Sequence, residues 1–138
     1  MSTLKEDTAL AVNLLAQDQR MRQLMEIKTK ADLSQQIVPM RQQPGEAMNK
    51  PLVCVYPKFV SNQGVHVTLN QLVVDVYTPL PTQRQTGVAF DITRRVKEIL
   101  DKKPIGRSLR WQSTDPDRRS STGWHKATVL FTFLSAQY

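Results

Sequence analysis

The N-terminal part of the chain carries an apolar side chain every three or four positions. Thr3 and Glu6 form a Thr-x-x-Glu capping box, in which each side chain satisfies a free backbone N–H at a helix start. We therefore expect a helix that begins near Leu4 and turns one apolar face toward a core. The residues of that face are Leu10, Leu14, Met21, Leu24 and Met25.

The periodicity disappears between residues 28 and 50, where Pro39, Pro44 and Gly45 interrupt the chain. This pattern predicts a long irregular connection at about 28–50. Loops of that length inside small domains are uncommon and are often functional or disordered. Two interpretations remain open: a segment that becomes ordered against a partner, or a flexible surface loop.

Two β-rich runs follow, at residues 51–56 and from Val65 onward, with the turn signal Asn62-Gln63-Gly64 between them. We expect a β-hairpin. In the second run the apolar alternation changes parity at Asn70-Gln71, which predicts a bulge or bend there. The two sets are Val65, Val67 and Leu69 before it, and Leu72, Val74 and Val76 after it.

A second helix is predicted between residues 88 and 103, because its apolar residues fall on one stripe and Pro104 and Gly106 end it. The stripe consists of Val88, Ala89, Ile92, Val96, Ile99 and Leu100. Residues 109–112 read as a short strand, and 114–123 as a polar loop. Residues 127–134 alternate throughout, which predicts a largely buried final strand.

This order of elements, α-β-β-α-β-β, predicts the fold class. We expect residues 1–138 to form a single α+β domain, with a mixed or antiparallel sheet of about four strands flanked by two helices. A sheet covered by helices is the simplest way to bury all the apolar stripes.

The charge is unevenly distributed along the chain. Residues 1–50 hold seven Lys or Arg against six Asp or Glu, whereas residues 51–138 hold twelve against six. Such an excess favours an acidic partner, either nucleic acid or the acidic face of a protein. No apolar run is long enough to span a bilayer, so no membrane partner is expected, and the single Cys54 fits a reducing cytoplasm.

The chain offers little material for catalysis or metal binding. His66 and His125 lie in strand patterns without a second ligand at a metal-binding spacing, and Cys54 is flanked by valines, as a buried inert thiol would be. Asp115 and Asp117 precede two arginines, so a solvated turn with local ion pairs is favoured. We expect no enzyme, no cofactor and no metal.

A protein interface is indicated on the second helix. The helical wheel places Phe90 near Lys97 on the charged side, where an exposed aromatic often marks an interface. Alternatively, the helix begins just after it, with Asp91 as the cap and Phe90 turned inward. The candidate interface residues are Phe90, Arg94, Arg95, Lys97, Arg118 and Arg119.

Five segments together resemble the tail-terminator and tail-completion proteins of tailed bacteriophages, which join head to tail at the neck. The resemblance covers most of the chain through element order and soft patterns. It rests on TALAVNLLAQDQRMRQLM, PLVCVYPKF, LNQLVVDVYT, GVAFDITRRVKEILD and GWHKATVLFTFL. The family pattern "P-x-V-x-V" corresponds to Pro51 to Val55, "V-D-V-Y" to Val74 to Tyr77, and "H-[RK]" to His125-Lys126.

The resemblance implies a structural virion protein. It would be a subunit of a homo-oligomeric ring, commonly a hexamer, that terminates the tail tube and contacts neck or connector proteins. Such a subunit would be assembled in the host cytoplasm, reside in the virion tail or neck, and touch passing DNA only non-specifically. The alternative is a basic nucleic-acid-binding module, although we find neither an aromatic set for stacking bases nor a GXXG loop.

Overall fold

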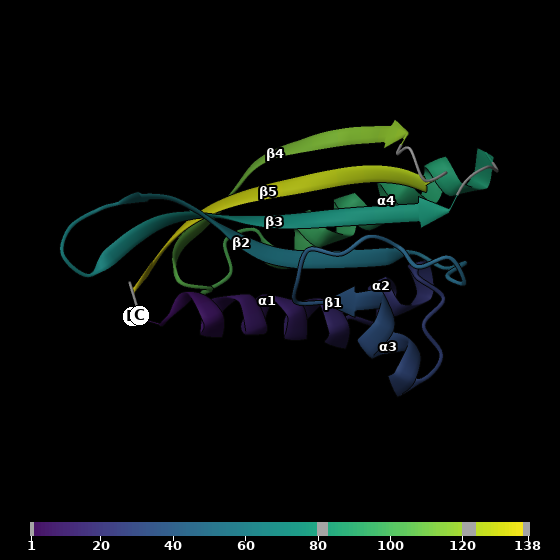
Figure 1. The fold of residues 1–138 in the computed structure, drawn as a ribbon, viewed down its shortest axis with the longest axis horizontal. Coiled ribbons are helices and arrows are strands. Elements are labelled where there is room, and N and C mark those ends of the chain that lie inside the picture. Colours follow the sequence, from purple (N-terminus) through teal and green to yellow (C-terminus); the bar gives the residue numbers. More distant parts are fainter. Residues whose placement is uncertain (1, 80–82, 120–123, 137–138) are drawn as a thin grey trace.

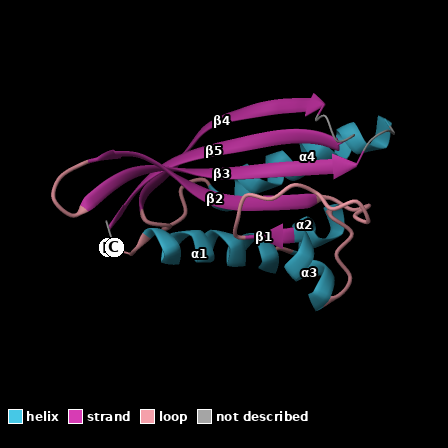
Figure 2. Cartoon of the chain, in the orientation of Figure 1, coloured by secondary structure: helices cyan, strands magenta, loops and turns pink. Residues whose placement is uncertain are grey.

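The computed structural model describes residues 2–79, 83–119 and 124–136. Within them the chain forms three helices, then three strands, a fourth helix and two further strands (Figures 1 and 2). In order, the elements are α1 (Leu4–Gln17), α2 (Gln19–Leu24), α3 (Lys30–Gln36), β1 (Ile37–Val38), β2 (Leu52–Asn62), β3 (Val67–Pro79), α4 (Gln83–Leu100), β4 (Arg107–Arg119) and β5 (Trp124–Ala136).

The strands form one mixed, five-stranded sheet in the order β1-β2-β3-β5-β4. The two-residue strand β1 runs parallel to β2, and the other neighbours are antiparallel. Helices α1 and α4 pack on one face, here called the helix face, while residues 39–51 pass over one end of the other face, the outer face (Figure 1). The predicted α+β class with a mixed sheet is confirmed.

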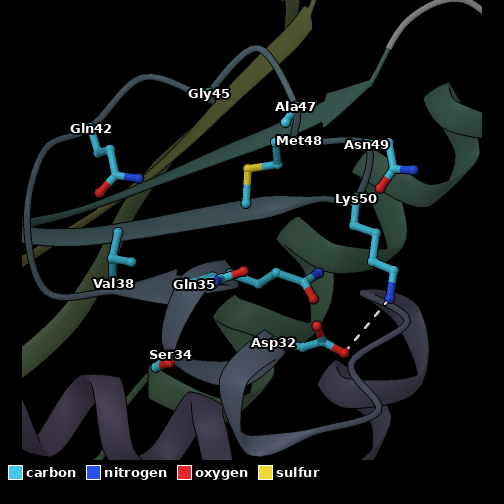
Figure 3. A pocket seen from close by; sticks show the side chains of 11 residues that line it. Asp32, Ser34, Gln35, Val38, Gln42, Gly45, Ala47, Met48, Asn49 and Lys50 are labelled. Atoms are coloured by element: carbon cyan, nitrogen blue, oxygen red, sulfur yellow. Dashed lines mark ion pairs between the residues drawn. The ribbon is translucent and has the colours of Figure 1, made fainter.

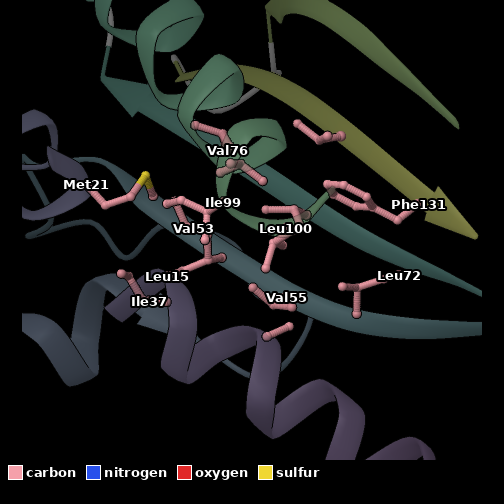
Figure 4. Packing of buried hydrophobic residues seen from close by; sticks show 14 of the residues in the cluster. Leu15, Met21, Ile37, Val53, Val55, Leu72, Val76, Ile99, Leu100 and Phe131 are labelled. Carbon is pink, nitrogen blue, oxygen red and sulfur yellow. The ribbon is translucent and has the colours of Figure 1, made fainter. Parts of the chain in front are cut away.

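The main core lies between the helix face and the helices (Figure 4). The predicted stripe of α4 is confirmed, since Ala89, Ile92, Val96, Ile99 and Leu100 are all buried. The alternation of the last strand is confirmed on this face as well, where Val129, Phe131 and Phe133 are buried beneath the helices. Burial of apolar area therefore holds α4 on the centre of the sheet.

The first predicted helix is divided into two. The capping box of Thr3 and Glu6 is present, but α1 ends at Gln17 because Asp18 adopts an extended conformation and caps α2. A helical wheel drawn for one continuous helix therefore does not describe this segment. Leu10, expected in the core, is exposed, whereas Ala11 and Leu15 are buried.

The connection at 28–50 is more regular than predicted. Thr29 caps α3 through a hydrogen bond that its hydroxyl accepts from the backbone N–H of Asp32, at 3.1 Å. The next residues form β1, which pairs with β2 at Val53 and Cys54. The irregular part is therefore limited to the stretch between β1 and β2, and the helix count rises from the two predicted to four among the described residues.

The bulge predicted at Asn70-Gln71 of β3 lies instead in the neighbouring strand β2. The pairing of β3 with β5 keeps one register from Val67 to Pro79, and the shift instead lies between Phe59 and Ser61 of β2, opposite Leu69 and Asn70. Asn70 is fully buried on the helix face. The apparent change of parity arose because a polar residue occupies a position that faces the helices.

The predicted polar loop at 114–123 is largely a strand. Residues 114–119 continue β4, which pairs with β5 up to His125, whereas 120–123 lie outside the described residues. Asp115, Pro116 and Asp117 are residue types that are depleted in strands, and pairing with a strong neighbouring strand overrides this preference. β4 is an edge strand with three register irregularities, as expected for an edge that resists further pairing.

A buried carboxylate, that of Asp7, fixes α1 to the turn after α4 and to the end of β5. Asp7 accepts hydrogen bonds from the backbone N–H of Gly106 at 3.0 Å and from the hydroxyls of Ser135, at 2.5 Å, and Ser2. Gly106 has a φ of 55°, and a Cβ there would lie 2.7 Å from the carbonyl oxygen of Leu134. The turn after α4 therefore requires glycine.

We predict that Gly106→Ala lowers the free energy of unfolding by at least about 1–2 kcal/mol, through the left-handed backbone and the close approach to Leu134. Urea denaturation measures this change. Gly45→Ala is the matched control, because no atom lies within 4 Å of its added Cβ, and its effect should stay within about 0.5 kcal/mol. Equal effects of the two substitutions would contradict the assignment.

Candidate interface surfaces

The solvent side of α4 presents the first candidate surface. Phe90 lies well inside the helix and its side chain is 54% exposed, so the inward-turned alternative is excluded. Asp91, Arg94 and Glu98 are also exposed on this side. We call Phe90, Asp91, Arg94 and Glu98 the α4 surface.

Arg95 is committed to an internal ion pair. Its guanidinium donates to both carboxylate oxygens of Asp18, at 2.9 and 2.6 Å, and to Glu98 at 3.1 Å. The side-chain hydrogen bonds from Arg95 lower the pKa of Asp18, against the opposing effect of burial. Because Asp18 also caps α2, accepting from the N–H of Met21 at 2.9 Å, this pair ties the α1–α2 junction to α4.

Lys97 also has an intramolecular partner. Its Nζ lies 3.6 Å from the ring centroid of Trp111 on β4, a cation–π contact. The indole N–H of Trp111 donates to the hydroxyl of Thr114, and its backbone N–H donates to Asp101. Lys97 therefore helps to fasten α4 to the edge strand.

The remaining candidates, Arg118 and Arg119, lie at the end of β4. Their backbone pairs with Lys126 and His125 of β5, while their side chains lie outside the described part of the structure. The structure thus brings Phe90 and Arg94 together on one exposed surface, uses Arg95 and Lys97 in internal contacts, and places the last two arginines on a different element.

The groups considered for chemistry do not converge. Burial raises the pKa of the Cys54 thiol to about 11, and the thiol contacts the carbonyl oxygen of Gln42 at 3.5 Å. His66 is exposed in the turn before β3, and His125 lies in β5. Among the described residues no three His, Cys, Asp or Glu side chains gather as a metal site would require. No helix in this part of the chain is long and apolar enough to cross a membrane.

The outer face carries a buried polar cluster that the sequence reading missed. Asp75 is 2% exposed and accepts hydrogen bonds from the hydroxyls of Tyr56 and Thr128, both at 2.7 Å, with Lys126 at 3.9 Å. Burial and the bond to Asp75 raise the pKa of Tyr56. An acidic residue between apolar neighbours in the run VVDVY was the available signal. Its partners come from two other strands.

A cavity of about 500 Å³ lies between α3, β1 and residues 42–50 (Figure 3). Gln36 is one of its lining residues, and its amide donates to the carbonyl oxygens of Met25 at 2.8 Å and Pro51 at 3.1 Å. Its own Oε1 is buried and accepts no hydrogen bond from the described groups. The ion pair of Asp32 and Lys50, at 3.7 Å, borders one side. The lining also includes Ser34, whose hydroxyl donates to the carbonyl oxygen of Ala31 at 3.0 Å.

Two further exposed apolar surfaces were not predicted. The tip of the β2–β3 hairpin exposes Phe59, Val60 and Val65, by 57%, 48% and 79% respectively. On α1, Leu10 is 40% exposed. A sequence pattern shows which residues are apolar, but whether another element covers them depends on tertiary arrangement.

Comparisons with known proteins support the fold over nearly the whole chain. No protein-family model matches the sequence, and no curated protein matches it. Among solved structures, a chain of the "Virion of native gene transfer agent (GTA) particle" is similar, with a TM-score of 0.63 at 13% identity over 94% of this chain and 93% of that one. At this identity the likeness shows a shared fold.

The pair of Asp18 and Arg95 should make stability depend on pH. Because the folded-state pKa of Asp18 is lowered, its ionised form contributes stability that is complete above the unfolded-state pKa and is lost as pH falls through the folded-state value. Asp18→Asn keeps a capping side chain but removes the charge. We expect it to cost about 1–2 kcal/mol near neutral pH, and less as the medium becomes strongly acidic.

Urea denaturation of the unmodified protein and of Asp18→Asn across the acid range measures how the cost of the substitution changes with pH. Glu98→Gln is the control, because Glu98 is more exposed and its pair with Arg95 spans a single helical turn, so its effect should be below about 0.5 kcal/mol. A cost of Asp18→Asn that stays constant throughout the acid range would show that the charge of Asp18 does not contribute.

Proposed function

We propose that this protein is a structural subunit of a phage-like virion. One observation carries the proposal: nearly the entire chain shares its fold with a chain of a gene transfer agent virion. The resemblance of its five sequence segments to phage tail-terminator and tail-completion proteins points to the same class independently. The part of the chain that the structure describes holds no assembled set of catalytic groups that would favour an enzyme instead.

Within that class we propose a ring subunit, commonly six per ring, that ends the tail tube and joins it to the neck or connector. Its function is then recognition, with tube and neck proteins as partners in the virion. A closed ring needs two different surfaces on each subunit, one for each neighbour. The α4 surface and the apolar hairpin tip are separate exposed regions that fit this requirement.

The basic excess has a smaller role in this account. Two of the cations proposed for the surface, Arg95 and Lys97, are paired with Asp18 and stacked on Trp111, which reduces what is offered to phosphates. Arg94 remains exposed. We propose that the protein contacts passing DNA only non-specifically. We do not propose a dedicated nucleic-acid-binding module.

Native mass spectrometry of the purified protein tests the proposal. We expect one closed oligomer, seen as rings by negative-stain imaging. Phe90→Ser should weaken the oligomer at least about tenfold in dissociation concentration, since a buried aromatic anchor contributes about 1–2 kcal/mol or more. Met40→Ser is the matched control, because Met40 is similarly exposed, at 53%, outside the α4 surface.

The proposal fails if the protein stays monomeric at every concentration tested and also does not bind purified tail tubes. An unchanged dissociation concentration for Phe90→Ser would remove the α4 surface from the interface while leaving the ring intact.

A further inference from the structure

The cavity between α3, β1 and residues 42–50 has the size of a ligand site. Its volume is about 500 Å³, and pockets that bind small ligands usually measure roughly 300–1,000 Å³. Met48 extends toward this space, and the ion pair of Asp32 and Lys50 borders one side (Figure 3). The lining residues come from α3, from β1 and from the irregular stretch before β2. Folding therefore builds a ligand-sized space beside the short edge strand.

One buried acceptor in the wall of this cavity has no partner. Gln36 is 3% exposed and is one of the lining residues. Its Nε2 donates to the carbonyl oxygens of Met25 and Pro51, which fixes the orientation of the amide, because a flipped amide would place Oε1 against those oxygens. Oε1 accepts no hydrogen bond from the described groups. Since buried polar atoms normally have a partner, this oxygen is suited to a donor that a ligand brings.

The two charges in the wall are already committed to protein groups. The Nζ of Lys50 lies 3.7 Å from the carboxylate of Asp32 and also donates to the carbonyl oxygen of Glu26 at 3.1 Å. The same carboxylate accepts from the backbone N–H of Lys28 at 3.4 Å. One cation and one anion at this distance offset each other. The wall therefore favours a neutral ligand over an ion.

The other side chains of the wall favour a ligand made of amides. Gln35, Gln42 and Asn49 carry both donors and an acceptor, as a peptide group does, and Val38 and Met48 add apolar surface. None of the lining residues that the structure describes is aromatic, so the wall lacks a ring on which a nucleobase would stack. A polypeptide segment matches this wall, because its backbone presents neutral N–H donors and carbonyl acceptors in succession.

We propose that this cavity binds a short polypeptide segment of a partner, with a backbone N–H of that segment donating to Oε1 of Gln36. The amides of the wall pair with its remaining peptide groups, and Val38 and Met48 contact a small apolar side chain. The segment comes either from a second copy or from a different protein of the assembly, two sources with the same chemistry. The site goes beyond the proposed ring, because it uses neither the α4 surface nor the hairpin tip.

Nuclear magnetic resonance of the full-length protein tests the site with N-acetylglycine N-methylamide, a neutral probe that carries two peptide groups. We expect saturable shifts of the side-chain amide signals of Gln36 and of the methyl signal of Met48. Acetate, methylammonium and glucose at equal concentrations should leave these signals in place. No saturable shift up to the solubility limit of the probe, or shifts as large with glucose or with either ion, overturns the assignment to a peptide.

The variant Ala47→Trp tests whether the probe occupies this cavity. Ala47 is exposed and lines the cavity, so an indole there fills part of the space while both bonds donated by Gln36 remain. We expect it to weaken probe binding at least about tenfold. Ala9→Trp is the matched control, because Ala9 is exposed on α1 outside the lining. Both variants should keep the urea midpoint of the unmodified protein, and equally strong probe binding by the two overturns the site.

The same pair of variants distinguishes the two sources of the segment. Ala47→Trp weakens the oligomer in native mass spectrometry if the segment comes from a second copy, and weakens only the binding of purified tail tubes if it comes from a different protein. Oligomer and tube binding that both match those of Ala9→Trp overturn the partner segment and leave the proposed function standing. A protein that binds the probe but forms no rings and binds no tubes contradicts the proposed function and supports the cavity as a peptide site.

Discussion

The buried carboxylate of Asp7 determines how the first helix sits on the sheet. It receives hydrogen bonds from the turn after α4, at Gly106, and from the end of β5, at Ser135. A buried charge costs several kcal/mol unless such partners satisfy it, so α1 cannot rotate about its axis without losing them. This constraint sets which side of α1 packs on the core and which side, with Leu10, faces outward. The exposed side of α1 is thus a consequence of an internal polar contact.

A second constraint is that the long strands of the sheet extend past the helices that pack on it. β2, β3 and β5 are long strands with paired backbones, but the helices cover only part of them (Figure 1). The hairpin therefore continues past the core and exposes Phe59, Val60 and Val65. On the outer face, Asp75 and its hydroxyl partners satisfy a charge between three strands, which favours one register of the central strands over slipped alternatives.

Much of the fold follows from local patterns, because the apolar stripe of α4 and the alternation of β5 each match one regular period. The break at Asp18 could not be predicted in this way, since its carboxylate is held by Arg95, far along the sequence. Polar residues of β4 become a strand only through pairing with β5. For the candidate interface, the helical wheel correctly predicted that the side chain of Phe90 is exposed. It could not show that Lys97 is covered by Trp111, because that contact joins separate elements.

The central claim is that the apolar surfaces exposed on one copy are buried between identical copies. An electron cryomicroscopy reconstruction of the purified oligomer tests it most directly. The account predicts cyclic symmetry, with each subunit using different surfaces toward its two neighbours and with Phe90, Phe59 and Val65 buried between copies. A two-fold dimer that joins like surfaces, or a ring in which the hairpin tip remains in solvent, would contradict it.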